Sequence, residues 1–134
     1  MSETLSEKKY MRLGKTVWFD DLMYFIYIGL SDKSLFCFLD FHSDFYENEY
    51  HIIDIKNLKK KIKKYMMSNI KEVQIGEIIE SNHWYLGTIG QFILKNKSLY
   101  LKYNQKNNNK LCYYHIITIN NLLKKIEKYT ELKK

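Results

Sequence analysis

The chain has 134 residues, of which 46% are hydrophobic, and a formal net charge of +7. A chain of this size is long enough to bury one ordinary hydrophobic core, so a single compact domain is expected. The longest apolar run, residues 22–30, is too short to cross a bilayer, and residues 1–9 lack an apolar signal-peptide core. We therefore expect a cytoplasmic or nuclear protein without a membrane partner.

The positive charge favours an anionic partner such as nucleic acid. This inference carries limited weight, because the chain has no Ala or Pro, a single Arg (Arg12) and abundant Lys, Asn, Ile and Tyr, as in proteins from very A+T-rich genomes. Lys is then the ordinary surface residue. The two cysteines, Cys37 and Cys112, lie in apolar strand-like segments, so we expect buried, reduced thiols rather than a disulfide or a metal site.

The first half of the chain contains patterns for four strands and one helix. Residues 1–9 are polar and are expected to form a flexible lead-in. Branched and aromatic runs predict strands over residues 10–18, 23–30, 35–41 and from residue 50 onward. Gly14 indicates a bulge or a close backbone approach, and the polar turn 31–33 suits a tight hairpin. A helix is predicted from Asp54, which suits its N-cap, to Tyr65.

The second half repeats this order of elements. Strands are predicted over residues 73–79, 84–94 and 99–103 and from residue 114 onward. Gly76 and the turn 95–97 take the places of the first glycine and the first turn, and a helix runs from Thr118 to Tyr129. Polar loops are predicted before the two final strands, over residues 42–49 and 104–110.

One motif occurs twice at a fixed offset. Tyr50–Leu58 and Tyr114–Leu122 share the tetrad Tyr-His-Ile-Ile and several later positions, and residues 33–36 fall on residues 97–100 in the same register. Such agreement over separated blocks indicates duplication. The predicted fold is α+β, with two ββββα repeats, residues 10–67 and 72–134, packed as one pseudo-twofold domain. Each repeat has an antiparallel sheet and a C-terminal helix.

Alternation along the third strand of each repeat separates two faces. Leu35, Cys37, Leu39 and Phe41, matched by Leu99, Leu101 and Tyr103, are expected to face the core. The opposite face carries Phe36, Phe38 and Asp40, matched by Tyr100, Lys102 and Asn104. Burial of these aromatic rings against the other repeat or a second chain is the alternative, and the sequence leaves it open.

The duplicated ββββα order resembles three families that bind single-stranded nucleic acid: PUR-repeat proteins, coactivators of the positive-cofactor-four type and plant Whirly proteins. The resemblance is carried by the Gly14 and Gly76 segments, the strands after the hairpins and the repeated strand-to-helix junctions. It implies that sheet surfaces hold single strands. The candidate binding residues are then Phe36, Phe38, Tyr100 and Lys102, with Lys33 and Lys97 at the hairpin edge.

Binding by backbone contacts and stacking, with weak base preference, is the expectation, because guanidinium stacking is almost unavailable to a chain with one arginine. The first hypothesis is a non-enzymatic binder of single-stranded DNA or RNA in transcription or genome maintenance, with no cofactor and no metal. The alternative is a protein-interaction or assembly module of the same fold, and pairing of two chains into a homodimer is left open.

An enzymatic reading is weak, because the chain has no phosphate-binding glycine loop and no nucleophile elbow. A metal-dependent hydrolase built on His42, Asp44, Glu49 and His51 is a third hypothesis, although their spacing matches no known ligand pattern. His51 and His115 are equivalent in the two repeats, so we expect them to share one structural role, such as a hydrogen bond at a strand edge.

Overall fold

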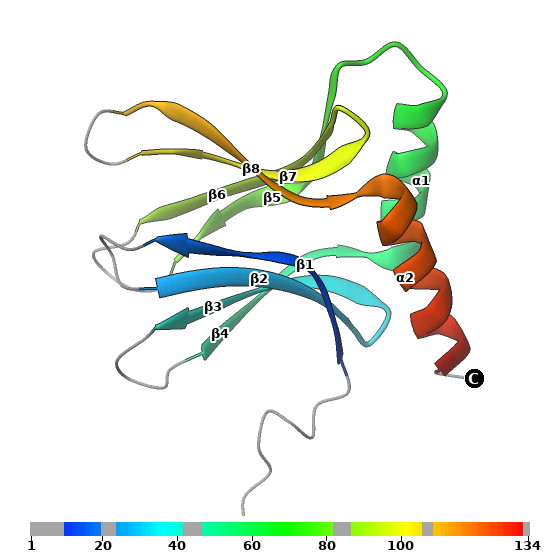
Figure 1. The fold of residues 1–134 in the computed structure, drawn as a ribbon, viewed down its shortest axis with the longest axis horizontal. Helices are drawn as coiled ribbons and strands as arrows, with labels where there is room; N and C mark the ends of the chain where they lie inside the picture. Colours follow the sequence, from blue (N-terminus) through cyan, green and yellow to red (C-terminus); the bar gives the residue numbers. More distant parts are fainter. Residues whose placement is uncertain (1–9, 20–23, 42–46, 82–86, 106–108, 133–134) are drawn as a thin grey trace, which may run out of the picture.

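The computed structural model describes residues 10–19, 24–41, 47–81, 87–105 and 109–132 and contains two four-stranded units, each followed by a helix (Figure 1). The first unit comprises β1 (Tyr10–Phe19), β2 (Tyr24–Ser31), β3 (Ser34–Phe41), β4 (Glu47–Asp54) and α1 (Ile55–Met66). The second comprises β5 (Glu72–Glu80), β6 (Thr88–Lys95), β7 (Ser98–Asn104), β8 (Leu111–Thr118) and α2 (Ile119–Leu132). The predicted α+β class with a duplicated ββββα order is confirmed.

Each unit forms one antiparallel sheet in chain order, β1-β2-β3-β4 and β5-β6-β7-β8. The two sheets lie one above the other and both helices lie at the same end of them (Figure 1). Edge strand β1 contacts β8, and β4 contacts β5. One cluster of buried side chains from both sheets and both helices fills the space between them. Each sheet therefore has an inner face toward this shared core and an outer face away from it.

The inner faces follow the predicted alternation. Leu35, Cys37 and Leu39 are fully buried in the core, as are Leu99 and Leu101 of the second repeat. Tyr103 is half-buried and packs against this core, and the side chain of Phe41, also predicted to face it, lies outside the described residues. The helices bury the predicted stripes in the same core: Leu58, Ile62 and Tyr65 in α1, and Leu122, Ile126 and Tyr129 in α2. Since the stripes recur at helical spacing, the lysines predicted on the other side of α1 stay exposed: Lys59, Lys60, Lys63 and Lys64.

The two thiols are both free, but their surroundings differ. Cys37 is fully buried in the core, and this burial raises the pKa of its thiol. Cys112 is half-buried, which corrects the expectation that both thiols are buried. It lies near the start of the edge strand β8, opposite the half-buried Tyr103, where the sheet covers it only in part.

A bulge interrupts the first strand of each repeat at its glycine. Between Leu13 and Val17 three residues of β1 lie opposite one residue of β2, and β5 has the same arrangement. Gly14 and Gly76 adopt positive φ angles of 65° and 73°. A Cβ on Gly14 would overlap the backbone carbonyl of Ile116, and one on Gly76 would overlap that of Ile52. Both predicted alternatives, bulge and close backbone approach, are thus present at these glycines.

The tight hairpins connect each sheet to both helices. Their loop residues, Asp32–Lys33 and Asn96–Lys97, all have positive φ, as two-residue hairpin loops require. The carbonyl of Lys33 accepts a hydrogen bond from the first amide of α1, Ile55, at 2.8 Å. The amide of Lys33 donates to the hydroxyl of Tyr129 in the other repeat, at 3.5 Å. In the second repeat Lys97 accepts from Ile119 at 3.0 Å and donates to Tyr65 at 2.9 Å.

The helix caps are those predicted from the sequence. A carboxylate oxygen of Asp54 accepts from the amide of Asn57 at 3.3 Å, and Thr118 Oγ1 accepts from the amide of Asn121 at 3.2 Å. Each cap lies where the last strand of its sheet turns directly into the helix. The same turn thus fixes the direction of both helices relative to their sheets.

The final strands begin earlier than predicted. β4 begins at Glu47 rather than Tyr50, and β8 at Leu111 rather than Tyr114, within segments expected to be loops. The early residues still form ladder pairs, such as Phe38 with Glu49 and Lys102 with Tyr113. They lie on edge strands, where polar side chains are compatible with pairing. Residue 23 and residues 84–86, also predicted as strand, lie outside the described residues.

Candidate nucleic-acid interface

The outer face of the first sheet carries a continuous row of aromatic rings. Trp18 of β1 lies 4.8 Å from Phe25 of β2, and the ring of Phe25 lies 6.1 Å from that of Tyr27. The row continues into β3, where Phe38 stacks on Tyr27 at 5.0 Å and an interplanar angle of 15°. We call this set the aromatic row; it consists of Trp18, Phe25, Tyr27, Phe36, Phe38 and His51.

The single arginine lies over this row. The guanidinium carbon of Arg12 is 3.9 Å from the centroid of the Tyr27 ring, and its Nη2 donates a hydrogen bond to Thr16 Oγ1 at 2.8 Å. The contact forms because β1 places its one arginine beside an aromatic residue of the neighbouring strand. The expectation that guanidinium stacking on bases is almost unavailable to this chain stays a prediction. Arg12 is exposed, so its charge lies at the surface of the aromatic row.

The predicted residues of the first face differ in exposure. Phe36 is half-buried, and His51 meets its ring edge-on at 5.4 Å. Phe38 is only 1% exposed, because Tyr27 covers one face of its ring and Phe36 lies beside it. The expectation that Phe38 offers its ring to a ligand is thereby corrected: it supports the row from below. Trp18, at 50% exposure, is the most open of the Trp, Phe and Tyr rings of the row.

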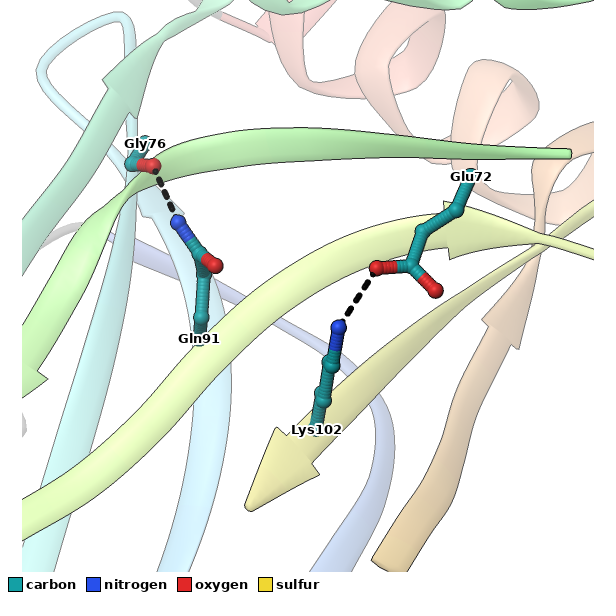
Figure 2. Close-up of polar contacts among 4 residues, drawn as sticks. All are labelled: Glu72, Gly76, Gln91 and Lys102. Atoms are coloured by element: carbon teal, nitrogen blue, oxygen red, sulfur yellow. Dashed lines mark hydrogen bonds and ion pairs between the residues drawn. The ribbon is translucent and has the colours of Figure 1, made fainter. Parts of the chain in front are cut away.

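The outer face of the second sheet is more polar. Tyr100 and Lys102 lie on it as predicted, both half-buried. Lys102 Nζ forms an ion pair with Glu72 of β5 at 2.8 Å, and this hydrogen bond raises the pKa of Lys102 (Figure 2). Gln91 of β6 donates to the carbonyl of Gly76 at 3.2 Å (Figure 2). The charge of Lys102 is therefore partly compensated within the sheet.

A cation also lies over an aromatic ring on this second face. Lys95 Nζ is 4.0 Å from the centroid of the Tyr113 ring, and Tyr113 meets Tyr100 edge-on at 6.4 Å. The second face thus has its own cation–aromatic contact, but fewer rings among the described residues. Because the core separates the two sheets, the predicted residues do not form one surface: Phe36 and Phe38 lie on one outer face and Tyr100 and Lys102 on the other.

The two hairpin lysines lie at the helix end of the molecule. Lys33 lines a groove of about 820 Å³ together with Lys56, Lys59 and Lys60 of α1 and Tyr129 of α2. The structure therefore groups Lys33 with the helix lysines, away from Phe36 and Phe38. Lys97 occupies the equivalent hairpin position, exposed, with its amide bonded to Tyr65. Hydrogen bonds to the helices fix the positions of both hairpins. The strand pattern in the sequence does not show these contacts.

The equivalent histidines share one structural role, as predicted. His51 Nε2 lies 3.2 Å from Ser34 Oγ, and His115 Nε2 lies 3.0 Å from Ser98 Oγ. Each links the final strand of its sheet to the start of the third. Within the described ranges, no group of three or more His, Cys, Asp or Glu side chains is placed to hold a metal ion. His42 and Asp44, two members of the hypothetical metal set, lie outside these ranges.

The sequence analysis missed four residues of this outer face: exposed Arg12 and Trp18, half-buried Phe25 and buried Tyr27. It assigned faces only along the third strands, although β1 and β2 form a hairpin whose paired residues share a face. Trp18 is paired with Phe25 across the two strands. Alternation along β2 would have placed Phe25 and Tyr27 on one face, but only the strand registers join them to Trp18 and Phe38.

Neither the protein-family models nor the curated proteins nor the solved structures compared with this chain include a match to it. In the part of the chain that the structure describes, no helix has the length and apolar character needed to span a membrane.

Proposed function

We propose that this protein binds single-stranded DNA or RNA on the outer face of its first sheet, as a non-enzymatic protein. The observation that carries the proposal is the aromatic row with Arg12 stacked on it. Rings that follow one another along a surface accept bases of any sequence by stacking, and an adjacent cation attracts the phosphates. The duplicated ββββα order, on which the resemblance to PUR-repeat, coactivator and Whirly proteins rests, agrees with this role.

We narrow the proposed binding site to part of the aromatic row. We assign base stacking to exposed Trp18 and half-buried Phe36, and a supporting role to the buried rings of Tyr27 and Phe38, which lie between them in the row. Tyr100 and Lys102 would contribute less, because the ammonium group of Lys102 is paired with Glu72. On this proposal the first repeat contributes more than the second to single-strand binding.

The proposal is tested by fluorescence polarisation of labelled mixed-sequence single-stranded DNA, single-stranded RNA and duplex DNA at two salt concentrations. We expect single strands to bind more tightly than the duplex, and binding to weaken with salt because condensed counterions are released. Trp18→Ala should weaken single-strand binding about tenfold, since stacking on an aromatic ring contributes roughly 1–3 kcal/mol per base.

Ile78→Ala is the matched control, because Ile78 is an exposed apolar residue, at 58% exposure, in the bulge of the other sheet. The affinity of this variant should stay at the wild-type value. Equal and weak binding to all three nucleic acids would contradict the proposal, as would equal losses for Trp18→Ala and Ile78→Ala.

A protein-interaction module is the second candidate function. The observation that favours it is the exposure of Trp18 beside Phe25, because aromatic residues are enriched in the centres of protein interfaces. Such an interface would depend little on salt, whereas nucleic-acid affinity falls steeply as salt rises. The same polarisation series therefore separates the two functions.

A further inference from the structure

A basic groove lies at the β1 edge of the first sheet, separate from the aromatic row on the outer face. It is a groove of about 480 Å³ between the bulge of β1, the end of β8 and α2. Four lysines line it, Lys15 from the bulge and Lys124, Lys125 and Lys128 from α2, together with His115 and Thr118. Among the described residues that line this groove there is no carboxylate. We call it the lysine groove.

The duplication provides an internal comparison for this surface. Gly14 lies against Ile116 as Gly76 lies against Ile52, so the bulge of β5, the end of β4 and α1 form the equivalent place in the other half. The residues that line the lysine groove are identical to their counterparts at every position except two. Lys15 is replaced by Glu77 in the middle of the bulge, and Thr118 by Asp54 at the helix cap.

Both differences change charge in the same direction. The described lining of the lysine groove has four lysines and a formal charge of +4, with histidine neutral. The equivalent positions hold three lysines, Lys60, Lys61 and Lys64, and two carboxylates, which leaves +1. A general abundance of lysine would affect both halves alike and does not account for this contrast. Among these lining positions, the two that differ between the repeats are the two that change the charge.

The helix cap strengthens the contrast. The backbone at a helix N-terminus carries a partial positive charge, which a carboxylate cap compensates and a hydroxyl cap does not. Thr118 caps α2 through its hydroxyl, whereas Asp54 caps α1 through its carboxylate. The partial positive charge at the N-terminus of α2 therefore adds to the charge of the lysines. The corresponding charge of α1 is compensated by the carboxylate of Asp54.

β1 connects the lysine groove to the aromatic row. Trp18 and Arg12 belong to the outer face, and Lys15 belongs to the groove. At about 3.3 Å per strand residue, Lys15 and Trp18 lie within about 10 Å along the same strand. A single strand whose bases stack on Trp18 would thus have phosphates within reach of the groove.

We propose that the lysine groove holds the phosphodiester backbone of the single strand whose bases stack on the aromatic row, an inference that rests on the proposed function. Lysine suits this task, because its ammonium group acts as a point charge toward phosphate without selecting a base. The equivalent surface of α1, with its two carboxylates, is excluded from the path. The nucleic acid is therefore bound on one side of a nearly symmetric molecule.

The test gives the lysine groove the charges found at the equivalent positions of the first helix and the β5 bulge. The variant Lys15→Glu with Thr118→Asp places in the lysine groove the residues that the other repeat carries at the same positions. Because that repeat folds with them, the variant is expected to fold, which circular dichroism and thermal melting verify. Lys59→Glu with Thr130→Asp is the control: it makes the same charge change in the groove around Lys33.

Affinity for labelled mixed-sequence single-stranded DNA is measured across a salt series. The groove variant should bind about tenfold more weakly or worse at low salt. The slope of log affinity against log salt should become shallower by about 0.7 for each phosphate that the groove no longer neutralises. The control variant should keep most of its affinity and its slope. The reverse exchange, Asp54→Thr with Glu77→Lys, should steepen the slope by creating a second such groove.

The outcomes separate the inference from the function on which it rests. If the wild-type protein fails to bind single strands, both are overturned. If the wild-type protein binds and Trp18→Ala weakens it, but the groove variant binds with unchanged affinity and slope, the groove inference is overturned and the proposed function stands. Equal losses in the groove variant and the control overturn the inference as well, because net charge alone would then explain the binding.

Discussion

Phe38 and Lys102 occupy equivalent positions in the third strands of the two repeats, yet they stabilise their sheets in different ways. Phe38 is buried beneath Tyr27 and Phe36, whereas Lys102 reaches across the sheet to Glu72. The neighbouring positions differ in parallel, since Tyr27 corresponds to Gln91, which bonds to the bulge backbone. The outer faces of the repeats have thus diverged, one being aromatic and the other polar.

The surfaces through which the repeats meet have changed far less. Both repeats keep the glycine that allows the close backbone approach and the tyrosine whose hydroxyl accepts from the opposite hairpin. The contrast indicates that packing between the repeats restricts the inner and edge residues, while the outer faces are free to acquire different binding properties.

Truncating the two equivalent side chains should give the largest contrast. Phe38→Ala is expected to lower the free energy of unfolding by about 3–5 kcal/mol, because it removes a buried ring and leaves a cavity. Lys102→Ala should lower it by about 1 kcal/mol or less, because the pair with Glu72 is partly exposed, at 28% and 27% of the two side chains. Denaturant unfolding of both variants measures the difference.

Salt and pH sharpen this first comparison. The effect of Lys102→Ala should shrink at high salt, while that of Phe38→Ala should not. Since Glu72 raises the pKa of Lys102 above its ordinary value of 10.5, the stabilisation is fully present below that pH and is lost as the pH rises through the raised pKa. Similar costs for the two variants would show that the faces are stabilised in the same way.

The glycine bulges should respond alike in the two repeats. Gly14→Ala and Gly76→Ala are each expected to cost about 3 kcal/mol, since an L-residue at positive φ costs roughly 1–2 kcal/mol and overpacking adds about 1–3 kcal/mol. Gly87→Ala is the control, because Gly87 has a φ of 63° and open space around its missing Cβ. It should cost only about 1 kcal/mol.

Thermal melting of the three glycine variants decides whether the bulges are equivalent. A loss at Gly14 much larger than that at Gly76 would mean that one backbone approach dominates the packing between the repeats. A loss at Gly87 as large as the others would assign the whole effect to backbone conformation rather than to packing against the opposite repeat.

The smallest expected effect concerns the hydrogen bonds between helix and hairpin. Tyr65→Phe should cost about 1 kcal/mol, because it removes the hydroxyl that accepts from the amide of Lys97 at 2.9 Å. Amide hydrogen exchange should accelerate at Lys97 and remain slow at Lys33, whose partner Tyr129 is intact. Unchanged exchange at Lys97 would show that this hydrogen bond does not protect the hairpin.

The order of elements, the duplication and the helix caps could all be predicted from the sequence, because they depend on local patterns. Alternation in β3 and β7 placed Leu35 and Leu99 in the core, and residue type alone identified the caps at Asp54 and Thr118. Alternation also placed Tyr100 and Lys102 on an outer face, although it could not show that the core separates them from Phe36.

The remaining features depend on contacts between distant segments. Phe38 is buried because a ring of β2 stacks on it, and Lys33 faces the helices because its hairpin docks against them. The aromatic row combines residues of three strands with His51 of a fourth, so no single segment contains its pattern. Strand registers were needed to assemble it.

The bond from the hairpin of Lys33 to the hydroxyl of Tyr129 joins residues that are 96 positions apart in the chain. During synthesis the hairpin therefore emerges long before its partner exists. At translation rates of about 5–20 residues per second, the delay is roughly 5–20 seconds. For that interval the inner face of the first sheet lacks the second sheet that covers it, so the nascent chain is most open to aggregation while its first half awaits the second.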